Sequence, residues 1–363
     1  MSSKKVINFG AGPGKLPEEV MLEVQREFVE YGDSGISVVE MSHRSQEYEA
    51  INNSAQRLVR ELLDIPDTYS VMFMQGGGTG LFCAVAMNLM SRSGKADYIV
   101  TGSWSAKAAK EAAKYGSVNL VLPKTDSYVD VPPQSSWNLD PEASYVYYCD
   151  NETVHGLEFP DIPDTKGVPL VVDMSSNILT RPFDITKFGV VFAGAQKNIG
   201  PSGTVLVIVR RDLLGSPLPI TPLVWDFTVM TKDNSLHNTP PTFGVFVMLR
   251  VFEWNKRQGG VQEMAARSAK KSSLIYNAIQ QSAGFYLCPV KPRARSRVNI
   301  PFRIAAGAEL EAKFLSEAKK RNMIQLKGHR LVGGIRASLY NAVTVEEAQT
   351  LAEFMKEFQK ANS

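Results

Sequence analysis

Apolar residues recur at helical spacing between positions 45 and 63, which predicts a long amphipathic helix. Its apolar face holds Ile51, Ala55, Leu58, Val59 and Leu62. Further along the chain, short apolar runs rich in β-branched and aromatic residues alternate with helical patterns. The runs that predict strands are 69–74, 96–101, 118–122, 145–149, 170–173, 190–193 and 204–209. This alternation predicts βα units and a mainly parallel sheet that is covered on both faces.

The pattern changes after Gly259 and Gly260. Long helical periodicities then enclose only two short strand-like runs, which is typical of an α+β arrangement. The predicted elements are a helix over 261–282, a strand over 298–304, a helix over 310–321, a strand over 334–338 and a helix over 345–358. We therefore predict a large α/β domain over 16–260 and a smaller α+β domain over 261–363, with residues 1–15 packing on the smaller one.

Composition and charge exclude several classes of protein. The chain has 363 residues, 44% of them hydrophobic and 21% charged, which is ordinary for a soluble globular protein. The net charge is +3 and no long basic block is present, so nothing indicates binding to nucleic acid. No apolar stretch approaches the ~20 residues of a membrane span, so we expect no membrane association.

The cysteines argue against both a disulfide framework and a metal site. Cys83, Cys149 and Cys288 are odd in number and far apart, and each lies among apolar or aromatic neighbours. We predict buried free thiols, no bound metal and a reducing compartment. The N-terminus shows neither a signal region nor a transit peptide, so the expected location is the cytoplasm.

Lys197 is the first candidate for chemistry, because it follows the apolar run 190–193 on a Gly-rich turn. A lysine in a dry pocket has a lowered pKa and attacks carbonyl groups. This is the requirement for a lysine that binds pyridoxal phosphate (PLP) through a Schiff base. The alternative is an exposed turn lysine, which would be the better interpretation if Lys197 stood alone.

Other predicted strand ends carry groups suited to the same cofactor. The run Gly76-Gly77-Gly78-Thr79-Gly80 lies between a strand and a helix, where backbone N–H groups can bind a phosphate; it can equally be a tight turn. Asp173 ends an apolar strand and could pair with a pyridinium nitrogen, or simply cap the next turn.

Trp104 and Thr153 also follow predicted strands. The indole of Trp104 can stack on a heteroaromatic ring, and the hydroxyl of Thr153 can donate a hydrogen bond. Taken singly, Trp104 is better interpreted as a core residue. The convergence of five such strand ends is more informative than any one of them.

Seven sequence blocks resemble the phosphoserine aminotransferases, a family of PLP-dependent class V enzymes of fold type I. The resemblance extends nearly from end to end of the chain. The blocks begin at Asn8, Met41, Gln75, Asn151, Phe192, His237 and Gly328, and the last of them runs through Arg336 to Asn341. The resemblance implies a large domain with a mainly parallel seven-stranded sheet, a smaller α+β C-terminal domain and PLP as cofactor.

The resemblance also implies residue roles. Lys197 would bind PLP covalently and move the proton, and Asp173 would hold the pyridine nitrogen. The other implied cofactor residues are Gly78, Thr79, Trp104, Thr153 and Gln196, with Asn238 and Thr239 reaching the cofactor phosphate of a second subunit. The implied substrate-binding residues are His43, Arg44, His329, Arg330 and Arg336. Arginine suits these positions because it binds carboxylate and phosphate through two parallel hydrogen bonds.

The implied activity is amino transfer between L-glutamate and 3-phosphohydroxypyruvate, giving 3-phospho-L-serine and 2-oxoglutarate for L-serine biosynthesis. Small molecules and a second copy of the chain are the expected partners, in a homodimer with shared active sites. Two alternatives stay open at this point. One is another class V activity, either glyoxylate-dependent transamination or cysteine desulfuration. The other is a non-catalytic α/β module that binds a phosphometabolite, for which Lys197 and Asp173 would have no use.

Overall fold

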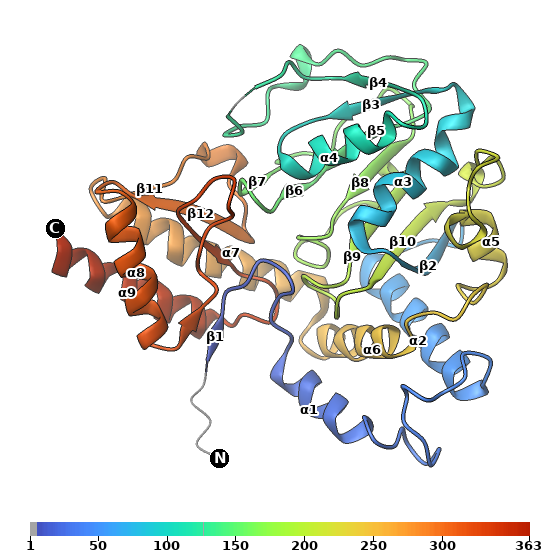
Figure 1. The fold of residues 1–363 in the computed structure, drawn as a ribbon, viewed down its shortest axis with the longest axis horizontal. Helices are drawn as coiled ribbons and strands as arrows, with labels where there is room; N and C mark the ends of the chain where they lie inside the picture. Colours follow the sequence, from blue (N-terminus) through green and yellow to red (C-terminus); the bar gives the residue numbers. More distant parts are fainter. Residues whose placement is uncertain (1–5, 126) are drawn as a thin grey trace.

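A seven-stranded sheet forms the centre of the computed structural model, which describes residues 6–125 and 127–363 (Figure 1). Its strand order is β2-β10-β9-β8-β5-β3-β4. The strands are β2 (Tyr69–Gln75), β10 (Thr204–Arg210), β9 (Val190–Gly194), β8 (Leu170–Asp173), β5 (Val146–Cys149), β3 (Lys95–Ile99) and β4 (Ser117–Leu120). The sequence prediction of a seven-stranded sheet is confirmed.

Five of these strands, from β9 to β4 in the sheet order, run parallel, whereas β10 is antiparallel to both of its neighbours β9 and β2. Four of the parallel strands, β9, β8, β5 and β3, are short and almost wholly buried, whereas the edge strand β4 is partly exposed. Burial on both faces explains why the sequences of β9, β8 and β5 are nearly continuous apolar runs and do not alternate with polar residues.

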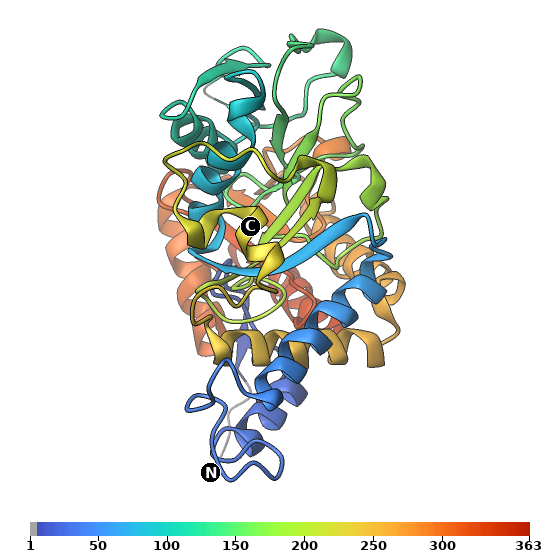
Figure 2. The ribbon, with the colours of Figure 1, turned by 90° about the vertical axis from the view of Figure 1, so that its right-hand side faces the viewer.

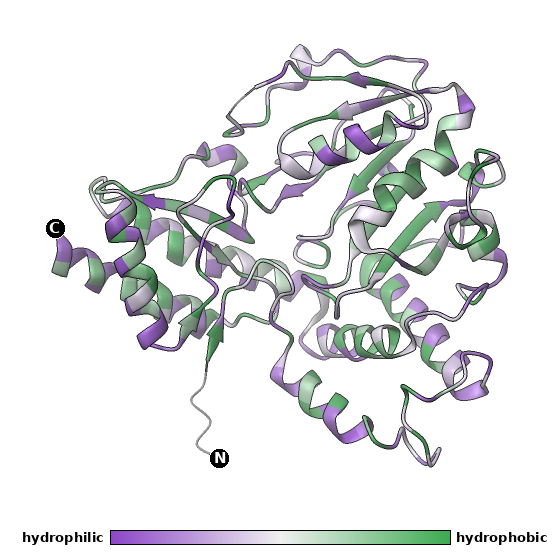
Figure 3. Ribbon diagram, viewed as in Figure 1, coloured by the Kyte–Doolittle hydropathy of each residue, from purple (hydrophilic) through white to green (hydrophobic). Residues whose placement is uncertain are grey.

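Helices cover both faces of the sheet, and successive strand residues point to opposite faces. Val190 and Phe192 pack with one set of helices, while Val191 and Ala193 pack with the other. One set is α3 (Gly77–Leu89), α4 (Ser103–Ala112) and α5 (Phe227–Lys232); the other is α1 (Glu18–Glu27), α2 (Gln46–Leu63) and α6 (Thr242–Arg257). Figure 2 shows α2 crossing α6, which it contacts, and Figure 3 shows the apolar strands enclosed by helices of mixed polarity.

The C-terminal part of the chain forms a separate apolar core. Its elements are α7 (Gly260–Gln280), β11 (Tyr286–Leu287), β12 (Asn299–Ile304), α8 (Ala308–Lys320), β13 (Met323–Ile324), β14 (Ile335–Ser338) and α9 (Val345–Asn362). The N-terminal strand β1 (Ile7–Asn8) pairs in parallel with β13, which joins this strand to the C-terminal part of the chain (Figure 1). Because α7 packs on both α6 and α9, the domain boundary at 260/261 stays a prediction.

Some local predictions need correction. The helix predicted from residue 45 begins at Gln46, because the Ser45 side chain accepts a hydrogen bond from the Tyr48 N–H and so caps the helix. Cys83 and Cys149 are buried free thiols as predicted, but Cys288 is only half-buried. The short hairpin of β6 (Asn151–Glu152) and β7 (Leu157–Glu158) was not predicted, since two-residue strands carry no periodicity.

Phe192 offers a test of the central packing. Its ring is fully buried on β9 and lies against Tyr147 and Phe82. We expect Phe192→Ala to lower the free energy of unfolding by about 3–5 kcal/mol, because the substitution leaves a cavity in a packed core. Urea unfolding measures the change, with Leu287→Ala, on a half-exposed side chain, expected to cost about 0.5 kcal/mol. Equal losses in the two variants would contradict this account.

Candidate active site

A cavity of about 280 Å³ opens at the carboxyl ends of β8 and β9. Parallel strands place their carboxyl ends at one edge of a sheet, which is where open α/β sheets bind ligands. The lining residues come from both parts of the chain: Ala11, Gly12, Gly78, Thr79, Phe82, Trp104, Thr153, Val154, Asp173, Ser175, Gln196, Lys197, His329 and Arg336. Nine of the predicted site residues are therefore brought together here.

Lys197 lies three residues beyond the end of β9, and its side chain is buried. Its Nζ donates a 2.6 Å hydrogen bond to Thr153 Oγ1 and lies 5.4 Å from the centre of the Trp104 ring. Burial lowers the pKa of the Lys197 amine, while the negative charge of Asp173 opposes this shift. A lowered pKa increases the fraction of neutral amine, which is the nucleophilic form.

Asp173 is the last residue of β8, the strand next to β9, and it is buried. Its Oδ1 accepts a 2.8 Å hydrogen bond from the Ser175 N–H. Burial raises the pKa of the Asp173 carboxyl group, and the nearby Lys197 amine lowers it. The two side chains therefore offset part of the cost of each other's burial.

Trp104 is positioned by a buried carboxylate that the sequence analysis did not single out. Glu152 accepts hydrogen bonds from the Trp104 N–H (3.0 Å), the Ser105 N–H (2.8 Å) and the Ser105 hydroxyl (2.6 Å). It thereby satisfies backbone donors at the start of α4, which holds the first turn and its indole at the cavity wall. Glu152 precedes Thr153 in the chain, but a glutamate normally indicates an exposed position and gives no sign of this burial.

The C-terminal part contributes one cation, Arg336, and a histidine, His329, whose pKa is lowered by burial and by nearby positive charges. Arg336 lies on β14, and its Nη1 donates a 3.2 Å hydrogen bond to the Thr153 carbonyl oxygen. His329 lines the same cavity from the loop before β14. Burial lowers the pKa of the Arg336 guanidinium, but not enough to remove its charge at neutral pH. The cavity therefore has a cationic side opposite the strand ends.

Five predicted site residues do not line this cavity. His43 and Asn238 are half-buried, and Arg44, Thr239 and Arg330 are exposed. Arg44 lies just before α2, and Thr239 lies beside the end of β2, where its carbonyl oxygen accepts a 3.2 Å hydrogen bond from Gln75 Nε2. The roles predicted for these five residues stay predictions.

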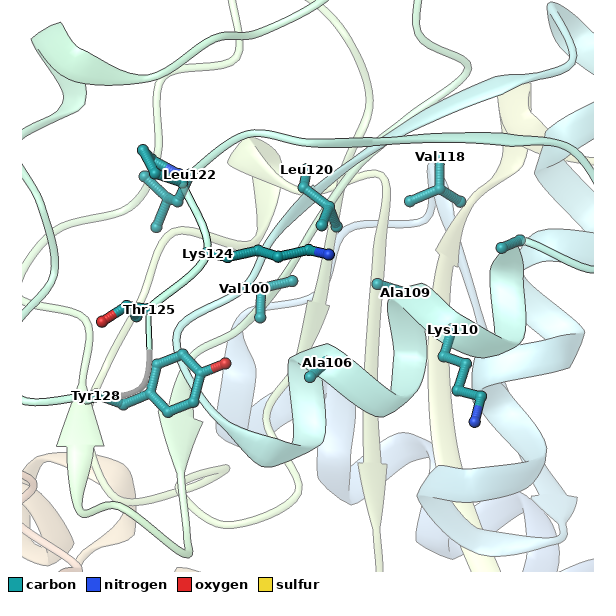
Figure 4. A pocket seen from close by; sticks show the side chains of 12 residues that line it. Val100, Ala106, Ala109, Lys110, Val118, Leu120, Leu122, Lys124, Thr125 and Tyr128 are labelled. Carbon is teal, nitrogen blue, oxygen red and sulfur yellow. The ribbon is translucent and has the colours of Figure 1, made fainter.

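A larger cavity, of about 490 Å³, lies between α4 and β4 (Figure 4). Its walls are mainly Val, Ala and Leu side chains, and Lys124 extends across it in the figure. No carboxylate or histidine is among its described lining residues. The predicted site residues therefore converge in the smaller cavity and not in this one.

Comparison with known proteins agrees with this geometry. The family model for class-V aminotransferases matches residues 6–351. A phosphoserine aminotransferase of Drosophila melanogaster is 61% identical over 98% of this chain and 99% of that protein. The structure of the phosphoserine aminotransferase from Bacillus circulans subsp. alkalophilus matches 99% of this chain and 100% of that one, with a TM-score of 0.96 and 43% identity.

The chain belongs to the phosphoserine aminotransferase family. A further structural match is a PLP-bound phosphoserine aminotransferase from Trichomonas vaginalis, with a TM-score of 0.94 and 37% identity over 97% of this chain and 100% of that one. The protein is an aminotransferase of class V, and its cofactor is PLP.

The cavity has the groups that PLP requires. In the part of the chain that the structure describes, no side chain caps the N-terminus of α3. The backbone N–H groups of its first turn can therefore bind a phosphate. Two buried polar atoms, Trp104 Nε1 and Gln196 Oε1, find no hydrogen-bond partner in the part of the chain that the structure describes. A buried carboxylate, Asp173, and a buried amine, Lys197, complete the set.

No group of residues suited to a metal ion occurs in the described ranges, and no described helix is long and apolar enough to cross a membrane.

His155, beside Thr153, allows a test at low pH. Its Nε2 lies 3.0 Å from the Ser103 hydroxyl, and burial lowers its pKa from 6.5 to about 4. The unfolded chain therefore binds a proton between pH 6.5 and pH 4 that the folded chain does not, and stability falls as the pH is lowered through this window. We expect His155→Gln to lose less stability than the wild type between pH 7 and pH 4.5, as measured by urea unfolding. Equal losses would show that His155 does not contribute.

Proposed function

We propose that the protein transfers an amino group reversibly between L-glutamate and 3-phosphohydroxypyruvate, giving 3-phospho-L-serine and 2-oxoglutarate. One observation carries the proposal: Lys197 and Asp173, from neighbouring strand ends, are buried in one cavity that Arg336 lines with a positive charge. A binding module for a phosphometabolite would need the arginine but neither the amine nor the buried carboxylate. In L-serine biosynthesis this reaction would supply the phosphorylated precursor.

We assign the proton transfer to Lys197. Bound PLP would supply an aldehyde that reacts with an amine and a ring that takes up electrons from the substrate's Cα. The lowered pKa of the Lys197 amine lets Nζ accept the Cα proton and return it as a general acid. Thr153 Oγ1, 2.6 Å from Nζ, would orient the amine when it is free.

The other cavity residues would hold the cofactor. Asp173 would keep the pyridine nitrogen protonated, because an ion pair stabilises the positive charge in a dry site. Gly78, Thr79 and Gln196 would bind the phosphate at the start of α3, and Trp104 would stack on the ring. The hydroxyl of Thr153 lies next to the Lys197 amine, and it would face the hydroxyl group of the PLP ring.

We further propose that the active unit is a homodimer, because several assigned residues lie outside their own chain's cavity. Each chain would supply the partner subunit's site with His43 and Arg44 for the substrate anion, and with Asn238 and Thr239 for the cofactor phosphate. Exposed apolar residues near His43 support a contact surface: Met21, Leu22, Phe28, Val29, Ile36 and Val39 are each at least 43% exposed. Arg330, with His329 and Arg336, would add to the anion site.

The state of the cysteines bears on the cell compartment and on one rival activity. Three free thiols support a reducing compartment, and we propose the cytoplasm. A cysteine desulfurase needs an exposed, reactive thiolate, whereas burial raises the pKa of all three thiols. The observed environments therefore favour transamination over desulfuration.

The direct test of the proposed function is formation of L-glutamate from L-phosphoserine and 2-oxoglutarate by the PLP-loaded protein. We expect turnover with L-phosphoserine and little with L-serine or L-alanine, since these lack the second anion. Lys197→Ala should lower kcat by at least about a hundredfold, because the proton has no carrier. Turnover of L-alanine with glyoxylate in preference to L-phosphoserine would overturn the substrate assignment, and an active Lys197→Ala variant would overturn the mechanism.

Mixed dimers test whether the sites are shared. Lys197→Ala and Arg44→Ala should each be nearly inactive alone. After the two are unfolded and refolded together, a hybrid dimer would contain one complete site, with Lys197 from one chain and Arg44 from the other. We expect the mixture to regain turnover, measured by the same glutamate assay. If the mixture stays as inactive as its components, Arg44 does not act across the interface.

A further inference from the structure

Lys271, on α7, is almost completely buried, with 1% of its surface exposed. Its Nζ donates three hydrogen bonds to backbone carbonyl oxygens, those of Leu339 (2.9 Å), Tyr340 (2.7 Å) and Val343 (2.8 Å). All three acceptors belong to residues 339–344, which connect β14 to α9 and which we call the β14–α9 loop. A single side chain therefore fixes the path of a segment without regular structure.

The geometry requires the ammonium form of Lys271. Three acceptors within 2.9 Å need three N–H donors, and a neutral amine has only two, with its lone pair facing the third carbonyl. The pKa of Lys271 is lowered to about 7, mainly by burial and less by the charges of Arg267 and Lys15, while Glu347 opposes the shift. A buried charge is costly unless it is fully hydrogen-bonded, so the Lys271 ammonium depends on these three carbonyl oxygens staying in place.

The β14–α9 loop contacts the active site at two points. Tyr340 Oη donates a 2.6 Å hydrogen bond to the carbonyl oxygen of Ala11, which lines the cavity. The Asn341 N–H donates a 2.8 Å hydrogen bond to Oδ1 of Asn198, the residue next to Lys197. The loop also begins directly after β14, the strand that carries Arg336.

We propose that Lys271 is a positioning residue for the aminotransferase reaction: by fixing the β14–α9 loop, it sets the relative placement of Lys197, Ala11 and Arg336. The inference rests on the proposed function, because it concerns the geometry of that same site. Lys271 touches neither the cavity nor a reacting atom, and its effect is transmitted through Tyr340 and Asn341.

The test compares the wild type with Lys271→Met, which has nearly the same side-chain volume, is one atom shorter, and removes the charge and the donors. We expect kcat per bound PLP to fall roughly tenfold to a hundredfold, as for a small misplacement of catalytic groups, with a smaller change in KM for L-phosphoserine. We also expect a shift in the visible absorbance of the PLP-loaded protein. Met264→Ala, a buried position elsewhere on α7, is the control: it should lower stability and leave kcat unchanged.

A double-mutant cycle tests whether the effect of Lys271 on kcat passes through Tyr340. Tyr340→Phe removes the hydrogen bond to Ala11, and its effect on kcat should be large in the wild type and small in Lys271→Met, because the loop is already displaced. If Lys271→Met does not fold, Lys271→Gln, which retains two N–H donors, replaces it throughout the cycle. Independent effects of the two substitutions, or an unchanged kcat per bound PLP, would overturn the proposal.

The outcome is separable from that of the proposed function. A wild-type protein inactive on L-phosphoserine would refute the substrate assignment alone. The absorbance of PLP-loaded Lys271→Met and its affinity for PLP need no substrate, so they test the positioning role even then. A spectrum and an affinity identical to those of the wild type would overturn that role.

Discussion

The burial of Asp173 beside Lys197 is the constraint on which the rest of the site depends. The parallel pairing of β8 with β9 fixes both residues at one sheet edge, where neither charge has full access to water. Each side chain shifts the pKa of the other towards the charged form, while burial acts in the opposite direction. This balance leaves a carboxylate able to hold a positive ring nitrogen and an amine able to react.

Contacts of Glu152 and Arg336 hold the residues around this pair in place. Glu152 ties the first turn of α4 to the hairpin that carries Thr153, so the indole wall and the hydrogen-bond partner of Lys197 move as one unit. On the opposite side, Arg336 donates to the Thr153 carbonyl oxygen, which connects the C-terminal part to the same hairpin. Thr153 is thus contacted through its side chain by the amine and through its backbone by the arginine.

The sequence allowed much of this to be predicted, for identifiable reasons. Continuous apolar runs marked the central strands, and polar residues at their ends marked the side chains that now converge in the cavity. Other features have no local signal. Lys270 and Lys271 are adjacent and chemically identical, yet one is exposed and the other is enclosed by three carbonyl groups. His43, Arg44, Asn238 and Thr239 lie outside the cavity, and periodicity gives no sign of what their side chains bind. The resemblance supplied their roles, and those roles stay predictions.

The contact between Tyr340 and Ala11 has a consequence for synthesis of the protein. The two residues are separated by 329 positions, and the first strand, β1, pairs with β13 close to the C-terminus. At about 5–20 residues per second, the ribosome needs roughly 15 to 65 s to make the intervening chain. During that interval the central sheet can form around its local βα units, while the N-terminal strand has no partner. The cavity wall is therefore closed last, and a ribosome-bound chain with a nearly complete sheet is still unable to catalyse the reaction.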